Sequence, residues 1–126
     1  MRELLIVGVG GFVGSILRFK VGSTIFHALP GTRFPWGTLT VNICGCMLVG
    51  IIASLLERLS SHNADLRLLL ITGFLGGFTT FSAFGLETMQ LLRIGEFSLA
   101  AANILASVLL GLTAVWLGLW LGHHVG

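Results

Sequence analysis

The chain has 126 residues, of which 55% are hydrophobic and only 10% carry a charge, and its mean hydropathy is +0.99. A water-soluble domain needs far more charge to cover its surface, so this composition excludes a soluble globular protein. The net charge of +2, with no run of five basic residues, also argues against a nucleic-acid partner. We therefore expect one domain embedded in a lipid bilayer.

Four apolar segments approach or exceed the length of about 20 residues that a membrane-spanning helix needs. We predict an all-α membrane protein with one four-helix domain over residues 1–126. The expected helices lie near residues 3–28, 35–57, 66–92 and 96–121. Short connections separate them: "LPGTRFP" (29–35) contains the turn residues proline and glycine, "RLSSHNADLR" (58–67) is polar, and "RIGE" (93–96) predicts a tight hairpin.

The first predicted helix contains closely spaced glycines and, further along, two basic residues. The stretch "LLIVGVGGFVGSILR" (4–18) suggests a dinucleotide-binding turn, but position 13 is valine and no acidic residue follows before Glu57. Gly10 and Gly14 instead form a G-x-x-x-G pattern, which lets membrane helices approach closely. Arg18 and Lys20 either extend to the membrane interface or form a positively charged vestibule that concentrates anions.

The second predicted helix carries Thr38, Asn42 and Gly45 at i, i+4 and i+7, which places them on one face. A buried amide in a membrane needs hydrogen-bond partners. Asn42 therefore either holds a dimer together through an interhelical hydrogen bond or lines a path for an anion. The neighbouring Cys44 and Cys46 are expected to be packing residues, because no further metal ligands lie near them in the sequence.

The fourth predicted helix carries Asn103, Ser107 and Gly111 at i, i+4 and i+8. This pattern is typical of interhelical hydrogen bonding and close packing of small residues in membranes. The alternative is that the Ser107 hydroxyl faces a pore.

The third predicted helix contains the stretch "GFLGGFTTFSAF" (73–84), which is apolar yet rich in residues that disfavour helices. Its three glycines and the Thr79–Thr80 pair predict a break near the middle of this helix. A break frees backbone carbonyls, which a membrane tolerates only where protein, water or an ion satisfies them. The stretch therefore predicts either a cation held by carbonyls or a glycine kink without an ion.

Phenylalanines recur every three residues around this break, at Phe78, Phe81 and Phe84. Residues with this spacing stand about 4.5 Å apart along a helix axis, so Phe81 and Phe84 should stack along one side. Aromatic stripes usually belong to a core or face lipid. However, aromatic edges are electropositive, and edge-on rings with donors from Asn42 and Ser82 would form a path for a small anion without a formal charge.

Glu87 is the only carboxylate deep within a predicted membrane helix. It follows Phe84 by three residues, so the two side chains should share a side of the helix. Glu87 serves either in a proton relay or as a hydrogen-bonded structural acid near the helix end.

Basic residues are distributed almost evenly between the two ends of the predicted bundle. One end has three (Arg2, Arg58 and Arg67) and the other has four (Arg18, Lys20, Arg33 and Arg93). The positive-inside rule needs an excess on one side, so this distribution gives no orientation signal. We expect the chain to insert in both orientations and to form an antiparallel homodimer, equivalent to the inverted repeats of larger transporters.

Three stretches together, "GGFVGSILRF" (10–19), "WGTLTVNICG" (36–45) and "GFLGGFTTFSAFGLE" (73–87), resemble the Fluc family of bacterial fluoride channels. The resemblance covers all four predicted helices and is most specific in the third stretch. It implies an antiparallel, dual-topology dimer in the bacterial inner membrane. It also implies passive export of fluoride from the cytoplasm through two pores.

The resemblance assigns roles to individual residues. Phe81 and Phe84 are implied to be pore phenylalanines, and Asn42 is implied to be the pore asparagine. The main-chain carbonyls of Gly76 and Thr79 are implied to hold a central sodium ion.

Further polar residues are implied to lie near the pore. By the resemblance, Ser82, Thr38 and Glu87 lie along or beside a polar track. Lys20 stands at a vestibule position where the family more often has arginine.

Two other functional classes are considered. A small four-helix drug/proton antiporter would also have dual topology, but it needs a membrane carboxylate in its first helix, where this chain has only Glu3 at the very start. A non-transporting membrane assembly subunit would explain the packing glycines but not the phenylalanines. We do not expect an enzyme, because the sequence offers no evident nucleophile–base pair or metal-ligand cluster.

Overall fold

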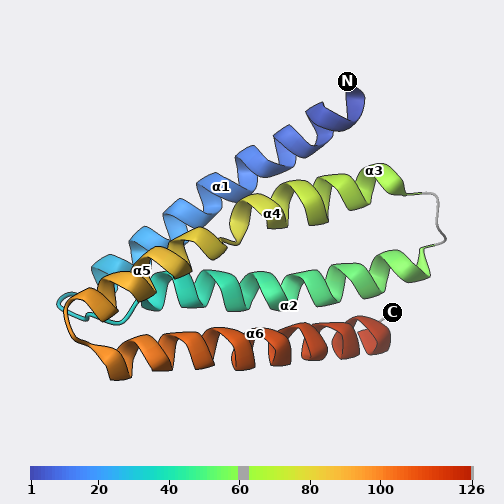
Figure 1. The fold of residues 1–126 in the computed structure, drawn as a ribbon. Helices are drawn as coiled ribbons and strands as arrows, with labels where there is room; N and C mark the ends of the chain where they lie inside the picture. Colours follow the sequence, from blue (N-terminus) through green and yellow to red (C-terminus); the bar gives the residue numbers. More distant parts are fainter. Residues whose placement is uncertain (60–62, 126) are drawn as a thin grey trace.

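The computed structural model describes residues 1–59 and 63–125, and over these ranges every regular element is a helix. α1 spans Arg2–Ala28, α2 spans Trp36–Arg58 and α6 spans Phe97–Val125 (Figure 1). The third long segment consists of α3 (Ala64–Arg67), η1 (Leu68–Leu75), α4 (Gly76–Phe78) and α5 (Phe81–Arg93). The four predicted helices are confirmed, and the largest boundary difference is at the last one, which ends at Val125 rather than at residue 121.

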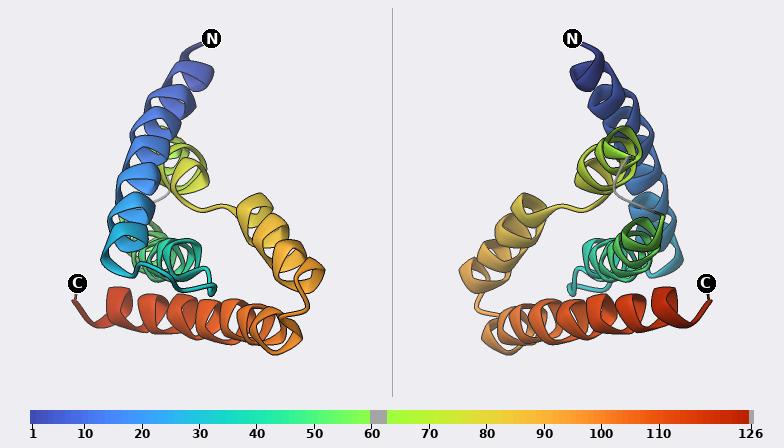
Figure 2. Two further views of the ribbon diagram at one scale, coloured as in Figure 1. Left: turned by 90° about the vertical axis from the view of Figure 1, so that its left-hand side faces the viewer. Right: turned by 90° about the vertical axis from the view of Figure 1, so that its right-hand side faces the viewer.

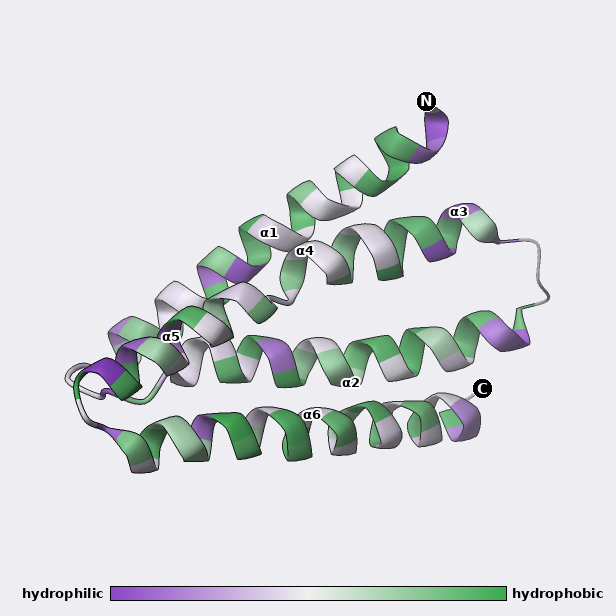
Figure 3. Cartoon of the chain, viewed as in Figure 1, coloured by the Kyte–Doolittle hydropathy of each residue, from purple (hydrophilic) through white to green (hydrophobic). Residues whose placement is uncertain are grey.

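All four long segments are sufficiently long and apolar to cross a membrane, with mean hydropathies between 1.6 and 2.2 in their most apolar windows. Along most of their length the helices consist of hydrophobic residues, while hydrophilic residues gather mainly at the two ends of the bundle (Figure 3). Both termini lie at the same end (Figure 1). Each end has an ion pair, between Arg2 and Asp65 at the end with the termini and between Arg33 and Glu96 at the other.

Glycines bring α1 into close contact with the first half of the third segment. A Cβ atom at Gly10 would lie 2.4 Å from a carbonyl oxygen of η1, and one at Gly14 would lie 2.0 Å from the carbonyl oxygen of Phe74. On the facing side, a Cβ atom at Gly77 would lie 2.6 Å from the carbonyl oxygen of Gly11. The close helix packing predicted from the G-x-x-x-G pattern is confirmed, because no larger side chain fits at these contacts.

A second glycine contact joins α2 to α6, the pair of helices with the most extensive contact in the chain. A Cβ atom at Gly50 would lie 2.4 Å from the carbonyl oxygen of Val115, and one at Gly118 would lie 2.3 Å from the carbonyl oxygen of Met47. α2 and α6 therefore form one closely packed pair, and α1 with η1 and α4 forms another.

The third segment changes its packing partner part-way along its length. η1 and α4 contact α1, whereas α5 contacts α6. Figure 2 shows α5 turned away from the line of the preceding helix and running toward the start of α6. The change of direction occurs at the two residues between α4 and α5, Thr79 and Thr80.

η1 is a π-helix, a wider form that the sequence did not predict. Nothing in its apolar sequence "LLLITGFL" distinguishes π from α geometry. Such turns often occur next to functional sites, and only the three residues of α4 separate this one from the interruption at Thr79.

The connection between α5 and α6 is the tight hairpin that the sequence predicted. Gly95 has a φ angle of +81°, a backbone conformation that favours glycine. The backbone N–H groups of Gly95 and Glu96 donate to the carbonyls of Leu92 and Leu91 at 3.1 and 2.9 Å, which satisfies carbonyls at the end of α5.

Candidate functional site

Helical geometry is interrupted at Thr79 (φ −85°, ψ 156°) and Thr80 (φ −149°, ψ 118°), which have extended backbone. The hydroxyl of Thr79, the residue after α4, donates to the carbonyl oxygen of Leu75, the last residue of η1, at 2.9 Å. The hydroxyl of Thr80 accepts from the backbone N–H of Ala83 at 3.2 Å and so caps the start of α5. The interruption therefore falls at the threonine pair, where the two hydroxyls end one helix and begin the next.

Asn42 on α2 forms two hydrogen bonds with the backbone of Thr80. Its Nδ2 donates to the carbonyl oxygen of Thr80 at 2.9 Å, and its Oδ1 accepts from the Thr80 N–H at 2.8 Å. Within the chain, Asn42 therefore forms its hydrogen bonds with the third membrane segment, and a contact of Asn42 across a dimer stays a prediction. The side chain of Asn42 satisfies both backbone polar groups of an extended residue inside a membrane-spanning segment.

Two main-chain carbonyls near the interruption lose their usual helical donors. In a continuous α-helix, the Thr80 N–H would donate to the Gly76 carbonyl and the Ala83 N–H to the Thr79 carbonyl. The first N–H donates to Asn42 and the second to the Thr80 hydroxyl. The carbonyls of Gly76 and Thr79 are also the two that the sequence resemblance assigns to a sodium ion.

Phe81 and Phe84 lie on the same side of the first turns of α5. Their ring centroids are 5.4 Å apart, so the predicted adjacency of this pair along one side is confirmed, but the ring planes are tilted by 41° rather than stacked. Phe81 is 82% exposed in the single chain. Phe78 does not continue this row, because it precedes the interruption; it is buried and stacks on Phe74 with centroids 6.0 Å apart.

A cavity of about 430 Å³, called here the aromatic cavity, adjoins the interruption on the side of Phe81 and Phe84. It brings together six of the site residues proposed from the sequence. These are Asn42, Gly76, Thr79, Phe81, Phe84 and Ser107. The residues lining it carry no formal charge, and Cys46 contributes a thiol.

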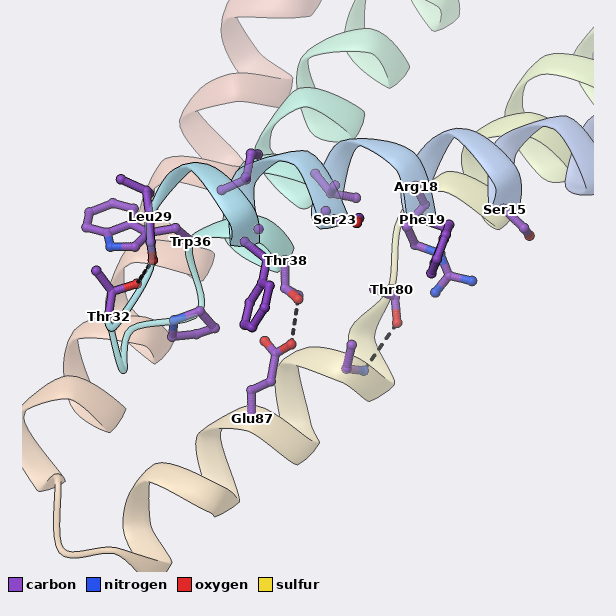
Figure 4. Close-up of a pocket in the computed structure, with 17 residues that line it drawn as sticks. Ser15, Arg18, Phe19, Ser23, Leu29, Thr32, Trp36, Thr38, Thr80 and Glu87 are labelled. Carbon is purple, nitrogen blue, oxygen red and sulfur yellow. Dashed lines mark hydrogen bonds between the residues drawn. The ribbon is translucent and has the colours of Figure 1, made fainter.

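A second cavity of about 450 Å³, called here the polar cavity, lies between α1, α2 and α5 (Figure 4). Its wall includes Arg18, Thr38, Thr80 and Glu87. The hydroxyl of Thr38 donates to Oε1 of Glu87 at 2.7 Å, whereas the buried Oε2 has no hydrogen-bond partner among the described residues. Thr80 lines both cavities, so the interruption forms part of the wall between them.

Some sequence-predicted residues lie elsewhere. Ser82 is exposed, lines neither cavity and has its Oγ 3.2 Å from that of Thr80. Lys20 is exposed and lines neither cavity, whereas Arg18 is half-buried in the wall of the polar cavity. Phe84 and Glu87 line different cavities, Phe84 the aromatic cavity and Glu87 the polar cavity.

Sequence reasoning missed the role of Thr80, which bonds to Asn42, caps α5 and lines both cavities. The available signal was a threonine at the expected break, a residue type that favours N-cap positions.

For Asn103, the interpretation as an interhelical hydrogen bond is confirmed. Its Nδ2 donates to the hydroxyl of Thr88 at 2.9 Å, and both side chains are buried between α5 and α6.

Comparison with known proteins gives extensive matches. A relative in Rhizobium etli, called fluoride-specific ion channel FluC, is 50% identical over 119 residues, which cover 94% of both chains. Relatives of the same name in Methylobacillus flagellatus and Agrobacterium fabrum are 46% and 43% identical over 118 and 125 residues. The alignment with the Methylobacillus flagellatus relative covers 94% of this chain and 92% of that relative. The alignment with the Agrobacterium fabrum relative covers 99% of both chains.

The family model described as CrcB-like protein, Camphor Resistance (CrcB), matches residues 5–119. This range includes the interruption, Phe81, Phe84 and every residue that lines either cavity. Four membrane-spanning segments and near-complete coverage at high identity agree with this match. The chain is a multi-pass membrane protein that belongs to the CrcB-like family.

Proposed function

We propose that this chain is a fluoride-selective channel that exports fluoride passively from the cytoplasm. The relatives described above are named as fluoride-specific ion channels and align over nearly their full length. The observation that carries the proposal is the aromatic cavity, in which Phe81 and Phe84 lie close to Asn42 beside an interrupted membrane helix.

The chemistry of the aromatic cavity suits a small anion. The edges of aromatic rings carry partial positive charge, and the inclined rings of Phe81 and Phe84 offer such edges at adjacent positions. The Ser107 hydroxyl adds a hydrogen-bond donor to the same cavity. Because no lining residue is formally charged, an anion would be held weakly enough to leave again, which conduction requires.

A small four-helix drug/proton antiporter is the alternative. Such a transporter needs an acidic residue within its first membrane span. In this chain Glu3 lies in the first turn of α1, and Glu87 lines the polar cavity rather than the aromatic one. The positions of these carboxylates favour a channel over a proton-coupled exchanger.

We further propose that a sodium ion binds at the interruption through the carbonyls of Gly76 and Thr79. Sodium is a hard cation that prefers oxygen ligands, and both carbonyls have lost their helical donors to side chains. Such an ion would supply positive charge next to the aromatic cavity and would satisfy backbone groups inside the membrane.

An antiparallel homodimer in the bacterial inner membrane, with one pore on each side, completes the proposal. Phe81 is 82% exposed in one chain, although its ring belongs to the proposed pore. A Cβ atom at Gly76 would meet only one ordinary contact, at 3.9 Å, so packing within the chain does not require glycine there. A second copy would cover Phe81, approach Gly76 and double the number of carbonyls around the sodium ion.

Fluoride efflux from proteoliposomes, measured with a fluoride electrode, tests this proposal. Phe81→Ile and Phe84→Ile should each slow efflux about tenfold or more, because each removes an aromatic edge worth about 1.4 kcal/mol to the permeating ion. Phe97→Ile is the matched control, since Phe97 is 67% exposed and lines neither cavity. If both pore variants conduct like the control, the aromatic path is wrong; if the unaltered protein moves no fluoride, the channel function itself is wrong.

A further inference from the structure

We propose that Asn42 is a positioning residue that holds the Thr80 amide away from the Gly76 carbonyl and thereby keeps the helix interrupted. This inference deepens the proposed function, because the Gly76 carbonyl is one of the proposed sodium ligands. It assigns Asn42 a role toward the backbone of its own chain, in addition to its place in the wall of the aromatic cavity.

The hydrogen bonds of Asn42 define this role. Its Oδ1 and one Nδ2 hydrogen are engaged by Thr80, at 2.8 and 2.9 Å. Together these bonds satisfy the N–H and the carbonyl of the same residue, as a neighbouring β-strand would. An amide is suited to this pairing because it offers a donor and an acceptor side by side without a charge.

A second feature of α2 supports the same contact. Gly45 stands three residues after Asn42, and a Cβ atom there would lie 2.2 Å from Cγ2 of Thr79. The α2 surface is therefore shaped for the extended backbone, with a glycine beneath Thr79 and an amide beside Thr80. Gly45 has no polar side chain, so its fit cannot serve an ion directly.

Without Asn42, the Thr80 N–H would become available to the Gly76 carbonyl, its partner in a continuous α-helix. A cation and this N–H would then compete for the same oxygen. Asn42 binds the Thr80 N–H and so leaves the Gly76 carbonyl free for a cation. In the same way, the Thr80 hydroxyl binds the Ala83 N–H and leaves the Thr79 carbonyl free. The apparent sodium affinity of the channel should therefore depend on a side chain that does not touch the ion.

The first test measures amide hydrogen exchange by NMR in full-length Asn42→Ala and Asn42→Asp variants. In Asn42→Ala the Thr80 amide can bond only to the Gly76 carbonyl, and only while the backbone at Thr79 and Thr80 turns helical, so its exchange should be about threefold to tenfold faster. Asn42→Asp keeps an acceptor and should retain protection. The Thr79 amide, which donates to Leu75 at 2.9 Å, is the internal reference and should change in neither variant. This measurement depends on neither fluoride conduction nor sodium binding, so its failure is separate from failure of the proposed function.

The second test measures how sodium chloride, exchanged against N-methylglucamine chloride, raises the melting temperature of the purified protein. Asn42→Ala should need about threefold to tenfold more sodium for the half-maximal rise in melting temperature, the same factor by which exchange of the Thr80 amide speeds up. Asn42→Asp should restore the sodium response of the unaltered protein but not its fluoride efflux, because a carboxylate in the aromatic cavity repels fluoride. A residue that only stabilised the fold would lower the melting temperature without changing the sodium concentration at half-maximum.

Gly45→Ala provides a variant that leaves Asn42 intact, with Gly111→Ala as its matched control. A Cβ atom at Gly111 would meet only Sγ of Cys46, at 3.6 Å, although both glycines are buried. Gly45→Ala should speed Thr80 exchange and weaken the sodium response, while Gly111→Ala should change neither. Unchanged Thr80 exchange in Asn42→Ala would overturn the proposal, as would a normal sodium response in a variant whose Thr80 amide exchanges faster.

Discussion

Gly14→Ala is the sharpest test of how the packing of α1 controls the interruption. A Cβ atom at this position would lie 2.0 Å from the carbonyl oxygen of Phe74 and 2.9 Å from the backbone nitrogen of Phe78. Both atoms belong to backbone and cannot rotate away, so α1 and the facing helix must separate by more than 1 Å to reach an ordinary contact distance of about 3.4 Å or more. We expect the substitution to destabilise the chain by about 3 kcal/mol, at the upper end of the range for overpacking.

The separation should also affect function, because Phe78 immediately precedes the interruption. Moving α4 away from α1 shifts Thr79 and Thr80 relative to Asn42 on α2, whose hydrogen bonds to the backbone of Thr80 are 2.8 and 2.9 Å long. We therefore expect Gly14→Ala to reduce fluoride efflux as well as stability.

Thermal unfolding in detergent, followed by tryptophan fluorescence, measures the stability change, and a fluoride electrode measures efflux. A loss of about 3 kcal/mol should lower Tm by roughly 10 °C for a chain of this size. Gly8→Ala is the matched control, since it lies in the same helix and a Cβ atom there meets nothing within 4 Å. Equal Tm and efflux in the two variants would refute the reasoning.

Two further predictions follow from the buried bond between α5 and α6 and from the balance of basic residues. Asn103→Ala should lower stability by about 1–3 kcal/mol because it leaves the buried Thr88 without its partner, whereas Thr113→Ala, at an exposed threonine, should have little effect on Tm. The double substitution Leu59→Lys with Asn63→Lys should orient every chain one way and abolish fluoride efflux. Coexpression with a chain that carries Ile94→Lys and Ser98→Lys, at the other end of the bundle, should restore efflux. Full efflux from either double variant alone would rule out the antiparallel dimer.

The sequence predicts the four spans well because hydropathy and length determine them almost independently of tertiary packing. The G-x-x-x-G pattern at Gly10 and Gly14 also has a direct structural meaning, since only small residues permit the observed backbone contact. The π-helix at Leu68–Leu75 could not be predicted in this way. It differs from an α-helix by a shift of hydrogen bonding along the backbone, and this shift leaves no periodic signal in eight apolar residues.

For the site, the sequence identifies residues but not all of their partners. Phe81 and Phe84 are adjacent as their spacing predicts, because one short helix carries both. Phe78 breaks the row, since the extended backbone at Thr79 and Thr80 changes the direction of the chain. The pairing of Asn42 with Thr80 joins residues 38 positions apart, and no local pattern specifies such a contact.

The way in which this helix is interrupted explains why threonine and asparagine occur there and proline does not. Proline would remove an N–H but would leave the carbonyls on both sides without any arranged partner. Here the Thr79 hydroxyl donates back to Leu75, the Thr80 hydroxyl accepts from Ala83, and Asn42 satisfies both polar groups of Thr80. These bonds compensate most of the cost of extended backbone in a membrane and divert the donors of at least two carbonyls. An interruption built from side chains can thus be stable and still present oxygen atoms to an ion. The hydrogen bonds that stabilise the extended backbone are also the ones that draw the N–H donors away from those oxygen atoms.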